Sequence, residues 1–359
     1  MRGGASLAAA HERRREPQRG TVSGRGLAGY TPAPSRMTRT DSHPARPAPG
    51  TASGWILFLV PCAIWGTTWL VIKFQLGVVA PEASVAYRFG LASLLLFGWC
   101  LLRGVGLRYD AGAHASFALL GVLNFGLNYV LVYLSEGYLT SGLVAVLFAL
   151  IVFWNLVGAR VFFGSPAPRA VVAGAALGLS GVAFLFWPDL TGLRPAPGQG
   201  LGMLLALLGS LVASAGNLFS QRLYGRGVPI VPSTAWAMGY ASLAVALSCG
   251  VRGIPFAFDA SAAYVASLAY LTVFGSVFAF IAYLTLIRRI GAGRAGYTAA
   301  VIPVVAMGTS TAFEGYRWSG LALAGMGLVL AGNVLVLRAK ERSASETPSQ
   351  RDNRAAPRP

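Results

Sequence analysis

The sequence predicts an all-α membrane protein of about ten transmembrane helices, built as two inverted-topology repeats of five helices each. Three observations predict this class. The 359-residue chain is 55% hydrophobic and 11% charged, with a mean hydropathy of +0.60. Apolar runs of the ~20 residues that a helix needs to cross a bilayer recur along it. A pattern in the first half of the chain also returns in the second half.

The first apolar run, Gly54 to Lys73, contains one small polar patch, Trp65-Gly66-Thr67-Thr68, and ends on a lysine. Charged residues and Gly/Pro breaks delimit the runs that follow. Continuous runs without apolar/polar alternation favour helices over a barrel, because a helix pairs its own backbone groups in lipid. The predicted spans lie near residues 54–73, 82–102, 115–135, 138–163, 169–187, 199–221, 232–251, 262–287, 293–313 and 318–337.

The regions outside these spans are two basic tails, at residues 1–52 and 340–359, whose Arg, Pro, Gly and Ser content predicts disorder. No apolar signal region precedes the first span, so Met37 is considered as an alternative start. The net charge of +17 comes from the tails and from alternate loops, so it indicates orientation and not nucleic-acid binding. The positive-inside bias places both termini in the cytoplasm.

An internal repeat is visible when the chain is aligned with itself. Residues 86–104 align with residues 235–253 at an offset of 149, which matches Gly90 with Gly239 and Arg103 with Arg252. The repeats are expected at 54–187 and 199–338. Five spans per repeat is an odd number, so the second repeat enters the membrane from the opposite side. Inverted repeats are the basis of alternating access, which favours a transporter.

Three segments carry a family resemblance: IWGTTWLVIK in the first span, Pro81 with Tyr87-Arg88 in the second, and AGYTAAVIPVVAMGTSTAFE at residues 295–314. In this order they resemble the EamA-type family of drug/metabolite transporters over residues 54–338. The resemblance implies a multi-pass inner-membrane carrier, and many members export amino acids and related metabolites. One departure makes the halves unequal: Pro303 and Glu314 align with Trp154 and Ser165.

Polar and aromatic residues inside the spans are the candidates for a substrate cavity, because such residues face the bundle interior or water. The alternative is ordinary bonding between helices. Four charged residues could contact a charged substrate, although snorkelling to the interface explains Lys73 and Arg88 equally well, and solvation explains Glu314. The cavity candidates are Trp65, Thr67, Thr68, Asn124, Asn128, Tyr129, Asn155, Asn217, Gln221, Tyr283, Tyr297 and Pro303, and the charged ones are Lys73, Arg88, Arg294 and Glu314.

Several chemistries are not expected. Glu82, Glu136 and Glu314 lie near span ends and no acid or histidine lies mid-span, so a buried carboxylate relay is not predicted. The three cysteines lack metal-site spacing. The GxGxxG at 291–296 follows an apolar helix instead of a strand, and is interpreted as a turn. No cofactor, metal site or catalytic residue is expected.

The predicted function is a secondary transporter that exports small neutral or zwitterionic metabolites such as amino acids by alternating access. The alternatives are a passive channel or membrane interaction protein and, less favoured, a membrane enzyme, which would need a nucleophile with a base or paired acids. The expected location is the plasma (inner) membrane. The expected partners are the substrate and the lipid bilayer, and not nucleic acid, with a coupling proton and a homodimer left open.

Overall fold

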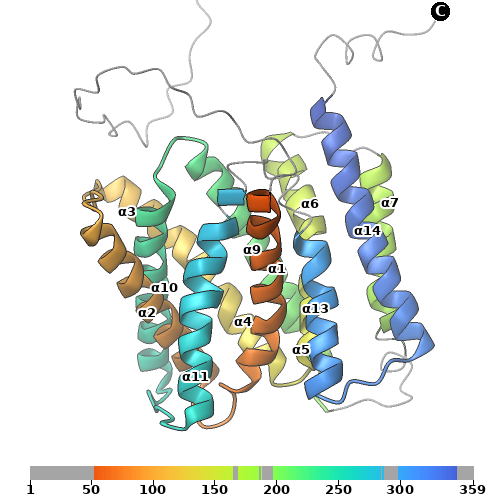
Figure 1. The fold of residues 1–359 in the computed structure, drawn as a ribbon, viewed down its shortest axis with the longest axis horizontal. Helices are drawn as coiled ribbons and strands as arrows, with labels where there is room; N and C mark the ends of the chain where they lie inside the picture. The colour runs from red at the N-terminus through yellow and green to blue at the C-terminus, as the bar shows by residue number, and fades with distance from the viewer. Residues whose placement is uncertain are drawn as a thin grey trace, which may run out of the picture. The chain divides into compact units, whose positions relative to one another are not determined.

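The computed structural model describes residues 52–164, 169–185, 187, 197–283, 285–286 and 298–345. Every regular element among these residues is a helix (Figure 1). The elements are α1 (Ala52–Lys73), α2 (Pro81–Leu102), α3 (Ala111–Gly121), η1 (Val122–Leu127), α4 (Asn128–Glu136), α5 (Ser141–Phe148), α6 (Ile151–Phe163), α7 (Arg169–Leu185), α9 (Gln199–Tyr224), α10 (Ile230–Arg252), α11 (Ala262–Tyr270), η2 (Leu271–Phe278), α13 (Thr298–Phe313) and α14 (Gly320–Ser345).

Seven helical segments of the described chain are long and apolar enough to cross a membrane. Three of them combine shorter elements: α3, η1 and α4 form one span, α5 and α6 another, and α11 continues through η2 to Tyr283. Three further apolar helices, Val172–Leu185, Val301–Phe313 and Gly320–Leu335, fall where the fifth, ninth and tenth spans are predicted. The prediction of an all-helical, multi-pass membrane protein is therefore confirmed.

The C-terminal boundary differs from the prediction. Helix α14 continues to Ser345, past residue 340, where the C-terminal tail was expected to begin. The extension contains alternating Arg, Lys and Glu between Arg338 and Arg342, residue types that propagate a helix well once the membrane span has nucleated it. The remainder of that tail and residues 1–51 of the N-terminal tail lie outside the described residues.

Helices α2 and α10 pack antiparallel across the two halves of the chain. Ser93 Oγ on α2 donates to the Ala235 carbonyl at 2.8 Å, and Ser242 Oγ on α10 donates to the Ala86 carbonyl, also at 2.8 Å. The offset of 149 residues exchanges these two bonds with each other. The repeat in the sequence is thus also a repeat of contacts.

Helices α7 and α14 form a second pair, whose contacts are exchanged by an offset of 151 residues. A Cβ on Gly181 would lie 2.5 Å from the Gly325 carbonyl oxygen, and one on Gly325 would lie 2.5 Å from the Gly181 carbonyl oxygen. Gly332 approaches the Gly174 carbonyl as closely. Only glycine allows two helix backbones to approach this near, which is the usual role of small residues between membrane helices.

The two ends of the bundle can be told apart by their contacts. One end, called here the Lys73 end, brings together the last turns of α1, α4 and α13 with the first turn of α5. The first turn of α2 meets the last turn of α10 there as well, through an ion pair of 3.0 Å between Glu82 and Arg252. Arg103, the sequence equivalent of Arg252, follows α2 at the other end.

Candidate functional site

Arg88 is the largest of the fully buried side chains among the described residues, with 1% of its surface exposed. It lies seven residues into α2, which corresponds to ~10 Å from the start of that helix. Its Nε donates to Ser276 Oγ at 3.0 Å and its Nη1 donates to the Tyr133 hydroxyl at 3.3 Å. The guanidinium also lies 4.7 Å from the ring centre of Tyr129 and 5.2 Å from that of Phe89. Arg88 therefore does not snorkel to the interface.

The charge of Arg88 has polar partners but no carboxylate partner. Tyr133 passes the hydrogen-bond chain on by donating to Gln75 Oε1 at 2.8 Å. Within the described residues, no Asp or Glu forms an ion pair with Arg88. Cation–π contacts and hydroxyl acceptors offset only part of the cost of removing a guanidinium from water. The site thus holds a buried positive charge suited to an anionic group.

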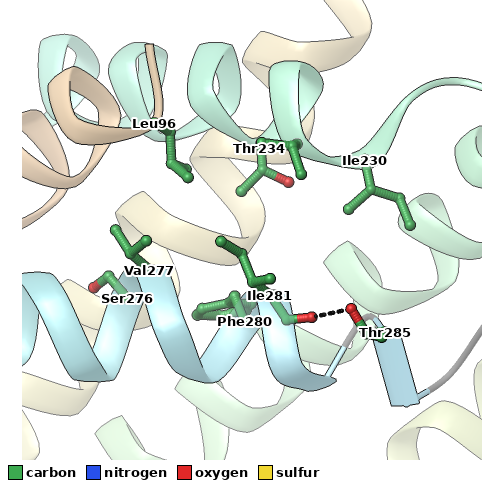
Figure 2. Close-up of a pocket in the computed structure, with 9 residues that line it drawn as sticks. Leu96, Ile230, Thr234, Ser276, Val277, Phe280, Ile281 and Thr285 are labelled. Atoms are coloured by element: carbon green, nitrogen blue, oxygen red, sulfur yellow. Dashed lines mark hydrogen bonds between the residues drawn. The ribbon is translucent and has the colours of Figure 1, made fainter. Parts of the chain in front are cut away.

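A pocket of about 80 Å³ lies next to Arg88, between α2, α10 and the segment that continues from η2 (Figure 2). Ser276, which accepts the Arg88 hydrogen bond, is buried at its inner end, whereas Ile230 and Thr285 are partly exposed. The pocket therefore leads from the end of the bundle opposite Lys73 toward the guanidinium. Its lining is Leu96, Ile230, Val231, Thr234, Ser276, Val277, Phe280, Ile281 and Thr285.

Sequence analysis did not select any residue of this lining. Three of its members, Thr234, Ser276 and Thr285, carry hydroxyl groups inside or at the ends of predicted spans, and that was the available signal. Two sequence-predicted residues lie beside it: Arg88 contacts Ser276, and Trp65 packs edge-on against Phe280 at 5.1 Å. The combination of apolar walls with a few hydroxyls is typical of small-molecule sites.

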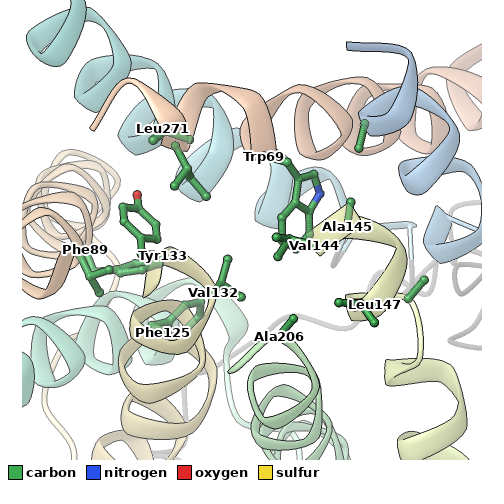
Figure 3. Close-up of a cluster of buried hydrophobic side chains, with 14 of the residues drawn as sticks. Trp69, Phe89, Phe125, Val132, Tyr133, Val144, Ala145, Leu147, Ala206 and Leu271 are labelled. Carbon is green, nitrogen blue, oxygen red and sulfur yellow. The ribbon is translucent and has the colours of Figure 1, made fainter. Parts of the chain in front are cut away.

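The Lys73 side of Arg88 is filled by a tightly packed apolar core (Figure 3). Side chains from both halves contribute to it, including Trp69 of α1, Val132 of α4, Val144 of α5 and Leu271 of η2. Tyr133 belongs to the same cluster and is fully buried. Buried apolar side chains and the buried Tyr133–Gln75 hydrogen bond thus lie between Arg88 and the Lys73 end.

A cationic side chain ties the helix ends together at the Lys73 end. Lys73 Nζ donates to the main-chain carbonyls of Glu136 and Leu139, the latter at 2.5 Å, and lies 3.7 Å from Glu314 Oε1. The side chains of Lys73 and Glu314 are 26% and 13% exposed. Lys73 thus joins α1 to the turn after α4 and to α13.

Glu314 stabilises the start of α5. Its carboxylate accepts hydrogen bonds from the Ser141 backbone N–H, at 3.1 and 3.0 Å, and also from the Ser141 hydroxyl. A carboxylate at a helix N-terminus pairs free N–H groups and interacts favourably with the helix dipole. The alternative in which Glu314 simply faces water does not hold. It links α13, from the second half of the chain, to α1 and α5 of the first.

Glu136, which its place near a span end had argued against as part of a buried carboxylate relay, is a buried carboxylate in the structure. The residue is fully buried, and neither of its carboxylate oxygens has a hydrogen-bond partner among the described residues. Sequence analysis placed it at a span end, where water is normally close. In the structure the start of α9 packs over this end of α4, with Ser135 Oγ donating to the Gly202 carbonyl at 2.8 Å.

Two predicted residues of α1, Trp65 and Thr67, form a polar seam with the segment around η2. Trp65 Nε1 donates to the Gly275 carbonyl at 3.1 Å, and its ring packs against Tyr283 at 5.1 Å. The Thr67 hydroxyl lies 2.7 Å from the Tyr270 hydroxyl. Thr68 bonds only within its own helix, to the Trp65 carbonyl. The seam joins the two halves of the chain.

The predicted asparagines mostly bond between helices. Asn124 Nδ2 donates to Ser220 Oγ at 3.1 Å, and Asn155 Oδ1 accepts from Ser214 Oγ at 2.9 Å. Asn128 Nδ2 donates to the Asn124 carbonyl, but its Oδ1 is buried without a partner among the described residues. Of the remaining candidates, Pro303 is buried in α13, and Tyr297 and Arg294 lie outside the described residues.

Asn217 and Gln221 are both exposed on α9. Seven residues are almost two helical turns, so Asn217 lies on the same face as the fully buried Ser210. A face that is buried near the middle of α9 is therefore open toward the helix's C-terminal end. That end is opposite the Lys73 end, so it is also the end at which the pocket opens.

Comparisons with known proteins agree with this arrangement of helices. A 28% identical relative, the "Uncharacterized inner membrane transporter YedA" of Escherichia coli K12, aligns over 77% of this chain and 88% of its own. An "Uncharacterized transporter" of Archaeoglobus fulgidus is 23% identical over 79% of this chain and 98% of its own. A "Probable amino-acid metabolite efflux pump" of E. coli K12 is 24% identical over 79% of this chain and 95% of its own.

A solved structure described as "Crystal structure of protein" has the same fold, with a TM-score of 0.60 and 19% identity over 82% of this chain and 99% of that one. The profile of the EamA-like transporter family matches twice, over residues 52–187 and 200–338. The two matches coincide with the halves whose contacts are exchanged in the α2/α10 and α7/α14 pairs. The chain therefore belongs to the EamA-like transporter family.

Proposed function

We propose that the protein is a secondary transporter that exports small neutral or zwitterionic metabolites, such as amino acids, by alternating access. In this proposal it lies in the plasma (inner) membrane with both termini in the cytoplasm. The pocket then opens to the cytoplasm, and the Lys73 end faces the other side of the membrane. The conformation described above is the one that loads substrate.

The packing of the two halves supports an inverted repeat. Contacts that are exchanged by a constant sequence offset are those of a pseudo-two-fold axis between antiparallel partners, as in α2 and α10. Two pseudo-symmetric halves have two related packings, each open at one end. Rocking of one half against the other alternates between them while the contacts near the axis are kept.

The observation that carries the substrate class is the buried guanidinium of Arg88 next to the pocket. A guanidinium presents several donors in one plane and binds a carboxylate with two parallel hydrogen bonds. Apolar and hydroxyl-bearing pocket walls suit the rest of a small amino acid. The relative that is named a probable amino-acid metabolite efflux pump supports the same class.

Counterflow in liposomes tests this proposal. Purified protein is reconstituted with unlabelled L-alanine, L-threonine or L-phenylalanine inside, and uptake of the labelled amino acid is followed. A transporter gives saturable counterflow, whereas uptake that neither saturates nor shows counterflow favours the channel. Labelled L-alaninamide, which lacks the carboxylate, serves as the matched probe.

Arg88→Gln should abolish amino-acid counterflow, because the substrate carboxylate loses its cationic hydrogen-bond partner. Arg88→Lys should retain only a small part of it, since an ammonium cannot reproduce the two-bond geometry. Arg103→Gln, at an exposed arginine of the same helix region, is the control and should match wild type. Equal counterflow of L-alanine and L-alaninamide by the wild type would contradict a carboxylate site at Arg88. All variants are first checked for monodisperse elution.

A further inference from the structure

Glu136 has surroundings that differ from those of the other acids at the Lys73 end. Glu82 is ion-paired with Arg252 at 3.0 Å, and Glu314 accepts hydrogen bonds from Ser141. Glu136 has neither kind of partner among the described residues, and none of its surface is exposed. An ionised carboxylate that is buried without a hydrogen-bond donor is strongly disfavoured. Neither an ion pair nor a helix cap gives Glu136 a structural role at this position.

The charged and titratable groups around Glu136 come from several helices. Lys73 of α1, Arg88 of α2 and Glu314 of α13 lie within electrostatic range of its carboxyl group, and Tyr133 lies one turn before it on α4. The first turns of α5 and α9, which also pack near this end of α4, contain no acid or base. The acid thus lies between two cations and a second acid.

Lys73 forms no hydrogen bond with the Glu136 carboxyl group in this conformation. Its donors are used by the main-chain carbonyls of Glu136 and Leu139, while the ammonium charge is shared with Glu314. Separation of α13 from α1 would release Lys73 from Glu314 and admit water to this end. The carboxylate form of Glu136 would then have both a cation and water to stabilise it.

We infer that Glu136 is the site at which the transporter binds and releases a coupling proton. The inference rests on the proposed function and adds the coupling ion to it. With the Lys73 end closed, the carboxylic acid keeps its proton. When that end opens, the O–H bond breaks, the proton passes to water on that side and a carboxylate remains beside Lys73. After the end closes, the carboxylate takes its next proton from the pocket side, past Arg88 and Tyr133, so that each cycle carries one proton across. Because the closed state binds the proton more tightly, protonation favours closure and loss of the proton favours opening.

Simultaneous measurement of substrate and proton movement tests the inference. Proteoliposomes containing the pH dye pyranine receive labelled L-alanine or whichever amino acid of the panel above shows the highest counterflow. The wild type is compared with Glu136→Gln, which cannot ionise, and with Glu82→Gln, a buried acid at the same end that is already ion-paired. Elution profiles establish that all three proteins are folded.

We expect substrate-driven proton movement in the wild type and in Glu82→Gln, and a reduction of about tenfold or more in Glu136→Gln. Counterflow by Glu136→Gln should also lose its dependence on pH. Proton movement by Glu136→Gln at the wild-type level would overturn the inference. So would wild-type counterflow that moves no protons, although that result would leave the proposed transport function standing.

A second measurement uses the unaltered protein and does not depend on knowing the substrate. Dicyclohexylcarbodiimide enters the membrane and adds to a protonated carboxyl group, and mass spectrometry of the modified peptide locates the adduct. Labelling of Glu136 should fall as pH is raised, and Glu82 should remain weakly labelled throughout. Absent or pH-independent labelling of Glu136 contradicts the inference. Absent counterflow with pH-dependent labelling instead contradicts the proposed substrates and not the proton site.

Discussion

The α2/α10 pair and the Lys73 end differ in how they use the repeat. In the middle of the α2/α10 pair, the serine and glycine contacts are exchanged with each other at an offset of 149 residues, which relates Ser93 to Ser242 and Gly90 to Gly239. At the Lys73 end the counterparts are chemically different. By the same offset the glutamates of this end have uncharged counterparts: Glu82 corresponds to Val231, Glu136 to Thr285 and Glu314 to Ser165.

The α2/α10 pair and the Lys73 end therefore have different roles. Helix contacts that both conformations need are repeated, because both halves must pack in the same way whichever end is open. The glutamates of the Lys73 end are present once, so their pairing with cations favours one end over the other. Lys73 corresponds to Arg222, but the acid that pairs with Lys73 has only a serine as its counterpart. We expect this asymmetry to keep the Lys73 end closed in the absence of substrate.

The glycine contacts between α7 and α14 should show the largest effects on stability. Gly181→Val and Gly325→Val each place a Cβ 2.5 Å from a backbone oxygen, which a helix cannot relieve without moving. We expect each change to cost about 1–3 kcal/mol and to lower the melting temperature in a fluorescence size-exclusion assay by similar amounts. Gly327→Val on the same helix, with no atom within 4 Å of its Cβ, is the matched control. By the repeat, the counterpart of Gly181 is Gly332, whose Cβ would lie 2.4 Å from the Gly174 carbonyl oxygen. Gly332→Val should therefore cost as much as Gly181→Val, and a large difference between these two variants would break the proposed symmetry.

The pairing of Lys73 with Glu314 should show an intermediate effect, on conformation more than on stability. Glu314→Gln keeps a hydrogen-bond acceptor for Ser141 but removes the charge that faces Lys73. Loss of a partly exposed ion pair of this kind is worth about 1 kcal/mol, so the open population of the Lys73 end should rise severalfold. Maleimide labelling of a cysteine introduced at Thr140 measures that opening.

The labelling comparison needs two controls. Asp259→Asn removes a carboxylate that bonds only to Ser261 within its own loop, and it should leave the labelling rate of the Thr140→Cys protein unchanged. The protein without the Thr140 change gives the background from Cys62, Cys100 and Cys249, all of which are buried. Unchanged labelling in Glu314→Gln would mean that other contacts keep this end closed.

The sequence predicts the helical segments and their repetition because hydropathy and small-residue patterns are local properties. Residues 86–104 and 235–253 are sufficient to find the α2/α10 pair. Side-chain environments are not local. Whether Arg88 snorkels or is buried depends on Tyr133 and Ser276, which are 45 and 188 residues away along the chain. Glu136 was discounted for its place at a span end, since its burial depends on how α9 covers it.

The hydroxyl groups of Ser93 and Ser242, which join α2 to α10, should have the smallest effect. They also give the sharpest test of the symmetry between the two halves. Ser93→Ala and Ser242→Ala each remove one hydrogen bond to a backbone carbonyl of the facing helix. Such bonds between membrane helices contribute about 0.6 kcal/mol, and a carbonyl already bonded within its helix tolerates the loss. The two losses should therefore be equal within error in the thermal assay. Ser116→Ala, whose hydroxyl bonds only to Gly112 of its own helix, should have no effect. If Ser93→Ala and Ser242→Ala instead change counterflow by different factors, the α2/α10 contact is not symmetric in function even though the repeat exchanges its hydrogen bonds.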